Sequence, residues 1–320
     1  MTMREPTRDG VLRAAVKIAD LLPPTPLLPV TIGGTTAWAK AESLQPIGAF
    51  KIRGAWHRLT DLSTEERARG VVGVSSGNHA QGVAWAARRL GIAATIVMPS
   101  DAPAVKLERT RALGAEIVLY DRRTEDRDAI AQALVEARGA TLVHAYADPW
   151  VIEGQGTAGI EITAQMARLG GPPTRIVAPC GGGGLTAGLA LACPDAEIVP
   201  VEPEGWDDVC RSLEAGAIQG ISADAPPTTC DALQTPATRP INFAVLKARC
   251  HAWVRVSEAE VATAQRFAFA HLRLVLEPGG AAALAAALAG KAPLDGRTAI
   301  MLSGGNVDAA RFTEVVAAED

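Results

Sequence analysis

The chain has 320 residues, a formal net charge of −4 and 48% hydrophobic residues. This length can bury one large core or two domains, and the weakly negative charge without a basic cluster excludes nucleic acid and membranes as expected partners. Five scattered cysteines without a CxxC pair indicate reduced thiols, so we expect a cytoplasmic protein.

The N-terminal residues contain no apolar run typical of a signal peptide. No uncharged apolar stretch of 18 residues occurs, so we expect no membrane span.

The first chemically informative residue is Lys51, in the segment 45–54. Gly48 precedes it, and Phe50 and Ile52 flank it. Burial among apolar neighbours lowers the pKa of a lysine and frees its amine as a nucleophile toward aldehydes. This segment alone is equally compatible with a surface lysine after a turn.

A polar turn follows the strand-like run 70–74 and precedes a helical pattern at 83–90. It consists of Ser75, Ser76, Gly77, Asn78 and His79. Backbone N–H groups and hydroxyls at a helix start can bind a carboxylate. The alternative is a plain N-cap, but a cap needs only one of these side chains.

Strand-like and helix-like stretches then alternate along the chain, which predicts an α/β fold with parallel strands. The predicted strands are short apolar runs at 94–98, 116–120, 197–201 and 298–302. The predicted helices are 104–113, 127–137, 258–272 and 281–289.

Four consecutive glycines, 181–184, lie between the strand-like segment 175–179 and the helical segment 185–190. Glycines allow the backbone to approach an anion closely, with a helix N-terminus behind it. The same loop also matches a dinucleotide fingerprint through Gly182, Gly184 and Ala187, with Glu202 ending the next strand. This alternative would make the protein an NAD-dependent oxidoreductase.

The Lys51 segment, the 75–79 turn, the tetraglycine and a late Ser303-Gly304-Gly305-Asn306 occur in this order. Together they resemble the pyridoxal-phosphate (PLP) enzymes of the tryptophan synthase β-like fold (fold type II), in the threonine/serine dehydratase and serine racemase group. The resemblance runs from about residue 10 to about residue 315. It implies open, twisted, mostly parallel sheets with flanking helices. A larger domain (1–64 and 146–320) would hold a smaller inserted α/β domain (65–145), with the site between them, and we expect a homodimer.

The resemblance also implies roles for individual residues. Lys51 would hold pyridoxal 5'-phosphate as a Schiff base and take the Cα proton, with Phe50 beside it. Asn78 would bind the ring hydroxyl, Ser303 the pyridine nitrogen, and the tetraglycine the phosphate. Ser76 would exchange a proton on the opposite face of Cα. The residues expected to bind an amino-acid substrate are Ser75, Ser76, Gly77, Asn78, His79 and Arg127.

The strand 197–201 leads into an acidic turn that resembles a metal site of racemase-like members. The matching ligands are Glu202, the Trp206 carbonyl and Asp208, and oxygen ligands suit Mg²⁺, Mn²⁺ or Ca²⁺. A solvated acidic turn without metal is the alternative.

We therefore expect a PLP-dependent ammonia-lyase (EC 4.3.1 type) that dehydrates a small β-hydroxy amino acid of the threonine/serine type to a 2-keto acid and ammonia, with a racemase side activity. It would be of the short, catabolic type. The alternatives are a serine or aspartate racemase and a 3-hydroxyaspartate dehydratase. The last would need Arg127 to reach the cleft rather than lie solvated at a helix start. A PLP-binding protein without turnover is a further alternative.

Overall fold

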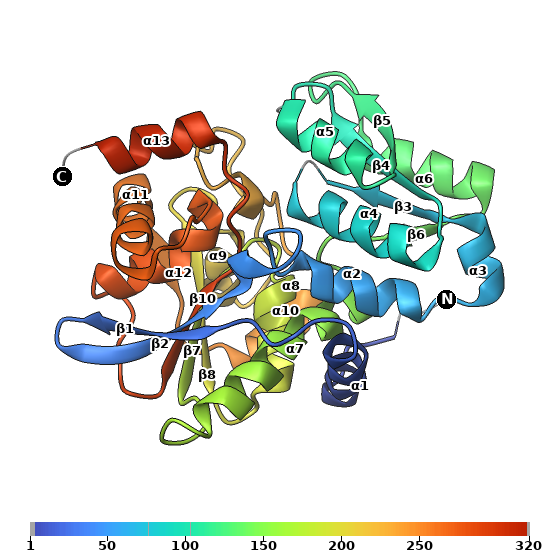
Figure 1. The fold of residues 1–320 in the computed structure, drawn as a ribbon. Helices are drawn as coiled ribbons and strands as arrows, with labels where there is room; N and C mark the ends of the chain where they lie inside the picture. The colour runs from blue at the N-terminus through green and yellow to red at the C-terminus, as the bar shows by residue number, and fades with distance from the viewer. Residues whose placement is uncertain (1–3, 76, 103, 319–320) are drawn as a thin grey trace.

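The computed structural model describes residues 4–75, 77–102 and 104–318, and it contains two β-sheets with flanking helices (Figure 1). One sheet has six strands and the other has four. The four-stranded sheet is formed by a continuous part of the chain, whereas strands from both ends of the chain form the larger one.

The larger sheet has the strand order β1-β2-β10-β7-β8-β9. Its strands are β1 (Leu27–Ile32), β2 (Thr35–Ala41), β7 (Arg175–Pro179), β8 (Glu197–Pro203), β9 (Val254–Val256) and β10 (Thr298–Leu302). Among these described strands, β1 and β2 pair in antiparallel fashion, and the other neighbouring strands are parallel. The last strand in the chain, β10, lies between β2 and β7.

The smaller sheet is entirely parallel and has the order β5-β4-β3-β6. Its strands are β3 (Val71–Val74), β4 (Ala94–Pro99), β5 (Glu116–Tyr120) and β6 (Thr141–Val143). All four lie within the segment 65–145 that the sequence assigns to an inserted domain. The domain boundaries themselves stay a prediction.

The helices before β7 are α1 (Arg8–Ala19), η1 (Glu42–Leu44), α2 (Lys51–Thr60), α3 (Thr64–Arg69), α4 (Asn78–Leu90), α5 (Ala104–Ala112), α6 (Arg127–Arg138) and α7 (Pro149–Met166). Those after β7 are α8 (Gly184–Ala192), α9 (Asp208–Ala215), η2 (Asp231–Leu233), α10 (Pro240–Arg249), α11 (Glu258–Phe267), η3 (Ala268–Leu272), α12 (Pro278–Leu288) and α13 (Ala309–Ala317). No helix in the described ranges is long and apolar enough to cross a membrane.

Local sequence signals explain several helix ends. Ser63 and Glu66 form a capping box at the start of α3, and Ser257 and Glu260 form one at α11. Gly91 ends α4 in the left-handed conformation, which glycine adopts without steric cost.

The four predicted strands are observed, two of them (β5 and β10) with the predicted bounds and two (β4 and β8) longer by one or two residues. Two predicted helices differ from expectation. The helix predicted at 258–272 is α-helical only to Phe267 and continues as a π-turn over Ala268–Leu272. The helix predicted at 281–289 starts earlier, because Pro278 fits the first helical turn, where its missing N–H costs nothing.

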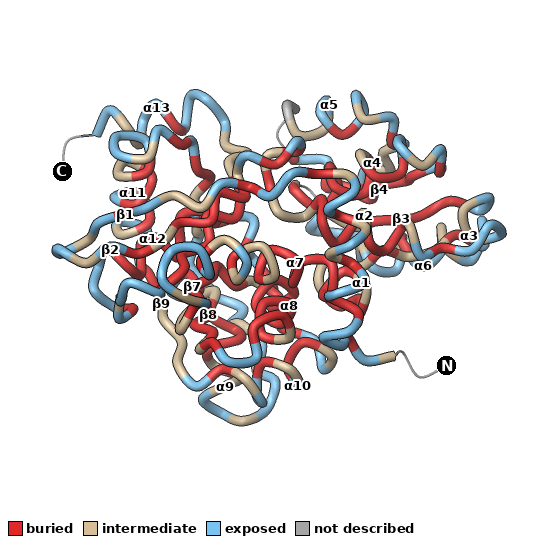
Figure 2. Tube along the Cα trace, turned by 60° about the horizontal axis from the view of Figure 1, so that its bottom comes forward, coloured by how far each residue is buried: buried red, intermediate tan, exposed pale blue. Residues whose placement is uncertain are grey.

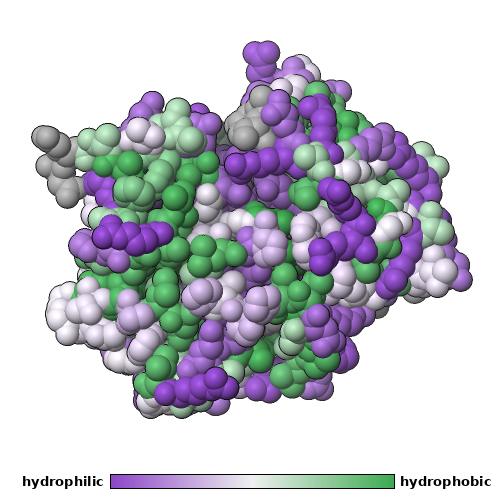
Figure 3. All heavy atoms as spheres, in the orientation of Figure 1, coloured by the Kyte–Doolittle hydropathy of each residue, from purple (hydrophilic) through white to green (hydrophobic). Residues whose placement is uncertain are grey.

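Apolar side chains fill both faces of each sheet, as expected for parallel strands covered by helices. Figure 2 shows that the buried segments include most of α7, α8 and the strands beside them. α7 and α8 approach closely through glycines, because a Cβ on Gly188 would lie 2.3 Å from the carbonyl oxygen of Ile152. On the face shown in Figure 3, hydrophilic residues are spread over both halves, with apolar groups between them.

A buried ionic cluster ties α2 to the larger half. Arg53 donates to Glu42 (Nε to Oε2, 2.7 Å) and to Glu161 (Nη1 to Oε1, 2.6 Å). Lys40 donates to the other oxygen of Glu161 at 2.6 Å. Two cations thus balance two carboxylates, which is the condition under which burial of such charges is tolerated.

Candidate active site

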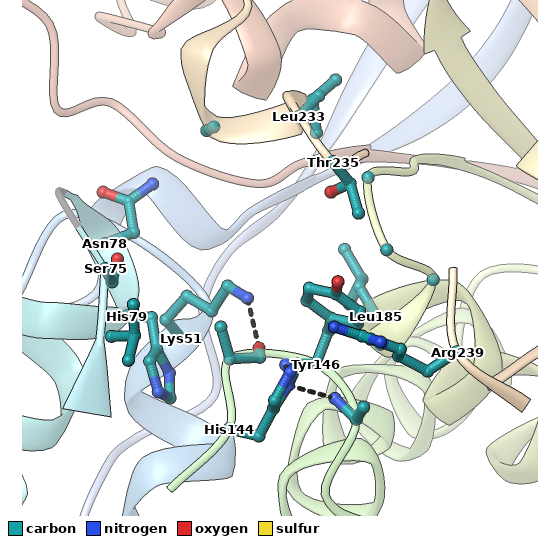
Figure 4. Close-up of a pocket in the computed structure, with 18 of the residues that line it drawn as sticks. Lys51, Ser75, Asn78, His79, His144, Tyr146, Leu185, Leu233, Thr235 and Arg239 are labelled. Atoms are coloured by element: carbon teal, nitrogen blue, oxygen red, sulfur yellow. Dashed lines mark hydrogen bonds between the residues drawn. The ribbon is translucent and has the colours of Figure 1, made fainter. Parts of the chain in front are cut away.

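A cavity of about 1130 Å³ lies between the two sheets, and residues from both halves line it (Figure 4). This volume is slightly above the range typical of small-molecule sites and is sufficient for a cofactor together with a substrate. The described residues predicted for the site that line it are Phe50, Lys51, Ser75, Gly77, Asn78, His79, Arg127, Gly181, Gly182, Gly183, Gly184 and Ser303.

Lys51 is the first residue of α2, and its side chain extends into the centre of the cavity. Its Nζ donates to the carbonyl oxygen of Ala145 at 2.7 Å. Burial lowers the pKa of this amine to about 8, although the carboxylate of Glu277 partly opposes the shift. The ring of Phe50 lies 5.2 Å from Nζ. A substantial fraction of the amine is therefore neutral near pH 8 and available as a nucleophile or base.

The polar turn after β3 reaches the cavity as predicted, except that Ser76 lies outside the described residues. The amide of Gly77 donates to the Ser75 hydroxyl at 3.1 Å. The Nε2 of His79 lies 2.8 Å from the Val143 carbonyl oxygen, and burial, followed by the charge of Lys51, lowers the pKa of the ring to about 3. His79 is therefore neutral, and its single N–H is committed to this backbone carbonyl.

Glu277 is a cavity residue that the sequence did not reveal. Its Oε1 accepts from Asn78 Nδ2 at 2.6 Å, and Asn78 Oδ1 accepts from Asn306 at 2.7 Å. Burial, followed by the charge of Asp231, raises the pKa of Glu277 to about 7. The only signal in the sequence was an acidic residue just before a Pro-Gly-Gly helix start, which is too common to identify a site.

The tetraglycine loop joins β7 to α8, and its conformation requires glycine. Gly183 has φ of +87°, in the left-handed region. A Cβ on Gly182 would lie 2.4 Å from the ring of Tyr146. Thr238 donates to the Gly182 carbonyl at 3.1 Å and fixes the loop from the other side. The loop thus presents bare backbone and the N-terminus of α8 to the cavity, an arrangement suited to a phosphate.

Ser303 follows β10 and is held close to the lysine segment. The amide of Phe50 donates to the Ser303 carbonyl at 3.1 Å, and Ala49 and Gly304 form a β-bridge. The end of the last strand and the start of α2 are therefore neighbours, although about 250 residues separate them in the sequence.

Arg127 starts α6 and lines the cavity, so it is not simply a solvated helix-start residue. Its Nε lies 3.8 Å from Asp128. Three further cavity residues near it were not singled out from the sequence as ligands: His144, Tyr146 and Arg239. They lie in an irregular segment after β6 and at the start of α10, where no periodic pattern marks them.

The acidic turn lies apart from the residues that line this cavity. Glu202 is buried and accepts from the amides of Val209 (3.2 Å) and Cys210 (2.7 Å). Both carboxylate oxygens of Asp208 are buried without a well-formed hydrogen bond. Burial raises the pKa of both carboxyls, that of Asp208 to about 7, and Asp208 also raises the pKa of Glu202. Trp206 donates from its indole to the Pro226 carbonyl at 2.7 Å.

These carboxylates are not a solvated acidic turn, since burial is nearly complete for both. Within the described ranges, however, no group of three or more His, Cys, Asp or Glu side chains could hold a metal. The dinucleotide alternative is also disfavoured, because the Glu202 carboxylate is committed to two backbone amides and is unavailable to a ribose hydroxyl.

Comparison with known proteins places these features in context. The model of a family described as pyridoxal-phosphate dependent enzymes matches residues 18–304. An L-threo-3-hydroxyaspartate ammonia-lyase from a Pseudomonas species is 41% identical over 288 residues, covering 88% of each chain. The crystal structure of a T.th. threonine deaminase superposes with a TM-score of 0.87 at 43% identity, covering 95% of this chain and 99% of that one. A maize serine racemase structure gives a TM-score of 0.90 at 33% identity, with 98% of both chains covered.

Proposed function

The chain belongs to the family of pyridoxal-phosphate dependent enzymes, with the fold type II architecture of threonine deaminase and serine racemase, and we propose that it is an ammonia-lyase acting on a small β-hydroxy amino acid. The family excludes the NAD-dependent alternative and confirms the predicted fold class and cofactor. The observation that carries the proposal is the buried amine of Lys51, with a pKa lowered to about 8, in a cavity that the glycine loop also lines.

The residues present fit the cofactor. The Lys51 amine is positioned for covalent attachment to an aldehyde, and the cradle of residues 181–184 has no side chains where a phosphate would lie. Asn78 and Ser303 line the same cavity and would hold the ring hydroxyl and the pyridine nitrogen, with Phe50 beside the lysine. When bound, pyridoxal phosphate supplies an electron sink for negative charge at Cα.

The chain's own groups would then handle the substrate and its protons. Ser75, Gly77 and Asn78 at the start of α4 would orient the α-carboxylate toward backbone N–H groups, with His79 ordering the turn behind them. The Lys51 amine would take the Cα proton on one face. Ser76 would exchange the proton on the other face. Loss of the β-hydroxyl followed by hydrolysis gives a 2-keto acid and ammonia.

A racemase activity is a second candidate function at the same site. Serine racemases from Schizosaccharomyces pombe and maize are among the similar proteins. Racemisation requires proton donors on both faces of Cα, which Lys51 and Ser76 would supply.

We also propose a divalent cation at Glu202 and Asp208, with the Trp206 carbonyl. The fit rests on Asp208, whose buried carboxylate oxygens have no well-formed hydrogen bond. A cation would offset the burial that raises the pKa of both carboxyls, and also the charge of Asp208 that further raises the pKa of Glu202. The homodimer, the cytoplasmic location and the inserted domain at 65–145 remain predictions.

The test is a substrate panel combined with Lys51→Ala. Purified protein with pyridoxal phosphate is given L- and D-serine, L-threonine and 3-hydroxyaspartate, and 2-keto acid and ammonia are measured. Lys51→Ala should lose the visible absorbance of the lysine-bound cofactor and lower turnover by several orders of magnitude, because attachment and base are lost together. Lys247→Ala, at an exposed lysine that binds the Gly216 carbonyl, is the control. Keto-acid release from no member of the panel would refute the lyase assignment.

A further inference from the structure

We propose that Arg239 binds the distal carboxylate of a dicarboxylic β-hydroxy amino acid and thereby determines which substrate the cavity prefers. This inference rests on the proposed lyase function and extends it to a substrate class. Arg239 lines the cavity from the larger half, directly before α10.

The backbone holds Arg239 in a fixed position at the cavity wall. Its carbonyl accepts from the amides of Asn242 (3.0 Å) and Phe243 (2.9 Å), and Pro240 starts α10 behind it. The preceding residue, Thr238, is bonded to the glycine loop. The start of the side chain is therefore fixed at the cavity wall, and its guanidinium offers planar donors that suit a carboxylate.

The positive charges around Arg239 exceed the negative charges, so a further carboxylate could bind there. Asp128 lies 3.8 Å from the Nη2 of Arg239 and 3.8 Å from the Nε of Arg127. Both distances are too long for hydrogen bonds, so Asp128 only partly neutralises two guanidinium groups that face the same cavity. One additional carboxylate would balance the second positive charge and use the planar donors of an arginine.

The lowered pKa of the neighbouring His144 is consistent with the same excess of positive charge. Burial is the first cause that lowers the pKa of its ring, to about 4, and the charge of Arg239 is the second. Lys51 and Arg127 lower it further, and only Asp128 opposes them. His144 is therefore neutral, and the cations around it have no compensating acid besides Asp128 on this side of the cavity in the described part of the chain.

The position of Arg239 favours a carboxylate of the substrate over the cofactor phosphate as the group that its guanidinium binds. The glycine loop is buried, whereas the Arg239 side chain is 51% exposed and points toward Asp128 on the opposite half. In Figure 4, Ser75 and Asn78 lie on one side of Lys51 and Arg239 lies on the other. An amino acid whose α-carboxylate lies at the turn would thus extend a second carboxylate toward Arg239.

The experiment compares two opposite changes of charge in the holoenzyme. Arg239→Gln should lower kcat/KM for 3-hydroxyaspartate by about ten- to a hundredfold more than for L-serine, mainly through KM, which is the range for hydrogen bonds between charged groups. Asp128→Asn removes the competing carboxylate and should lower the KM for 3-hydroxyaspartate. Arg239→Lys should recover part of the loss. Arg123→Gln, which removes an equal charge from a fully exposed side chain, is the control.

Binding of succinate, measured by displacement of the substrate and by thermal shift, provides a readout without turnover. Succinate should bind the wild type more tightly than Arg239→Gln. Equal losses on both substrates, or a raised Kd for pyridoxal phosphate in Arg239→Gln, would assign Arg239 to the cofactor and overturn the proposal. If the wild type binds succinate as proposed but releases no keto acid from any substrate, the lyase function fails while the carboxylate site stands.

Discussion

Glu277 allows a quantitative test of the electrostatics in the cavity. Its carboxyl is buried, and its pKa is raised from 4.5 to about 7, first by burial and then by the charge of Asp231. Below pH 4.5 the Glu277 carboxyl is protonated in both the folded and the unfolded protein, so it does not make the free energy of unfolding depend on pH. As the pH rises to 7, the unfolded protein gives up this proton first, so stability is lost across this window. Each unit of difference between the folded and unfolded pKa corresponds to about 1.36 kcal/mol. The free energy of unfolding therefore falls by about 3 kcal/mol in total, and the fall is complete above pH 7.

Glu277→Gln removes this titration and keeps an oxygen that can accept from Asn78. The free energy of unfolding of the variant, relative to the wild type, should therefore increase by about 3 kcal/mol between pH 4.5 and pH 8. Urea unfolding of the cofactor-free protein, followed by tryptophan fluorescence at several pH values, measures this difference.

Glu204→Gln is the matched control. The Glu204 side chain is exposed, and its Oε1 lies 3.9 Å from the Nζ of Lys291, which is too far for a hydrogen bond. This variant measures the effect of the same Glu-to-Gln change at an exposed position. A Glu277→Gln curve that runs parallel to the wild-type curve would show that burial does not raise this pKa, and the reasoning would be refuted.

Three further predictions concern the cofactor, metal and proton sites. Gly182→Ala should weaken pyridoxal phosphate binding at least about tenfold in a titration of the cofactor-free protein, because the new Cβ would lie 2.4 Å from the Tyr146 ring. An unchanged affinity would contradict the proposal that the glycine loop binds the phosphate. EDTA should lower the melting temperature, Mg²⁺ or Mn²⁺ should restore it, and Asp208→Asn should abolish this response; an unchanged curve after verified metal removal would leave the carboxylates as a metal-free pair. Ser76→Ala should abolish deuterium exchange at Cα of D-serine and spare that of L-serine, since Lys51 still acts on the L-enantiomer; equal losses would show that Ser76 transfers no proton.

The sequence predicted the fold, and the described residues of the motifs it singled out line one cavity, because both the strands and these motifs leave local patterns. Short apolar runs located the strands, and the cavity contains Lys51, the described part of the 75–79 turn, the tetraglycine and Ser303. These segments are recognisable because glycine, lysine and clustered polar residues are rare next to buried strands.

The remaining cavity residues could not be found in this way. Glu277, His144 and Arg239 lie in segments with no periodicity, and only the packing of the two halves brings them together. The proposed metal ligands follow from a resemblance to racemase-like members, and that resemblance did not predict that Glu202 and Asp208 would be buried. The helix predicted at 258–272 has the predicted extent, but the sequence did not predict that Ala268–Leu272 would be a π-helix.

The position of β10 has a consequence for how the protein forms in the cell. In the described part of the chain, the β1–β2 hairpin joins the rest of its sheet only through β10, which is synthesised after the other strands of that sheet. All four strands of the smaller sheet, which ends at β6, are made far earlier. At 5–20 residues per second, roughly 10–30 s separate the completion of the two sheets. During this interval the hairpin edge stays unpaired, so a chaperone that shields it should raise the yield of folded protein. Lys51 can meet Ser303 only after β10 has been synthesised.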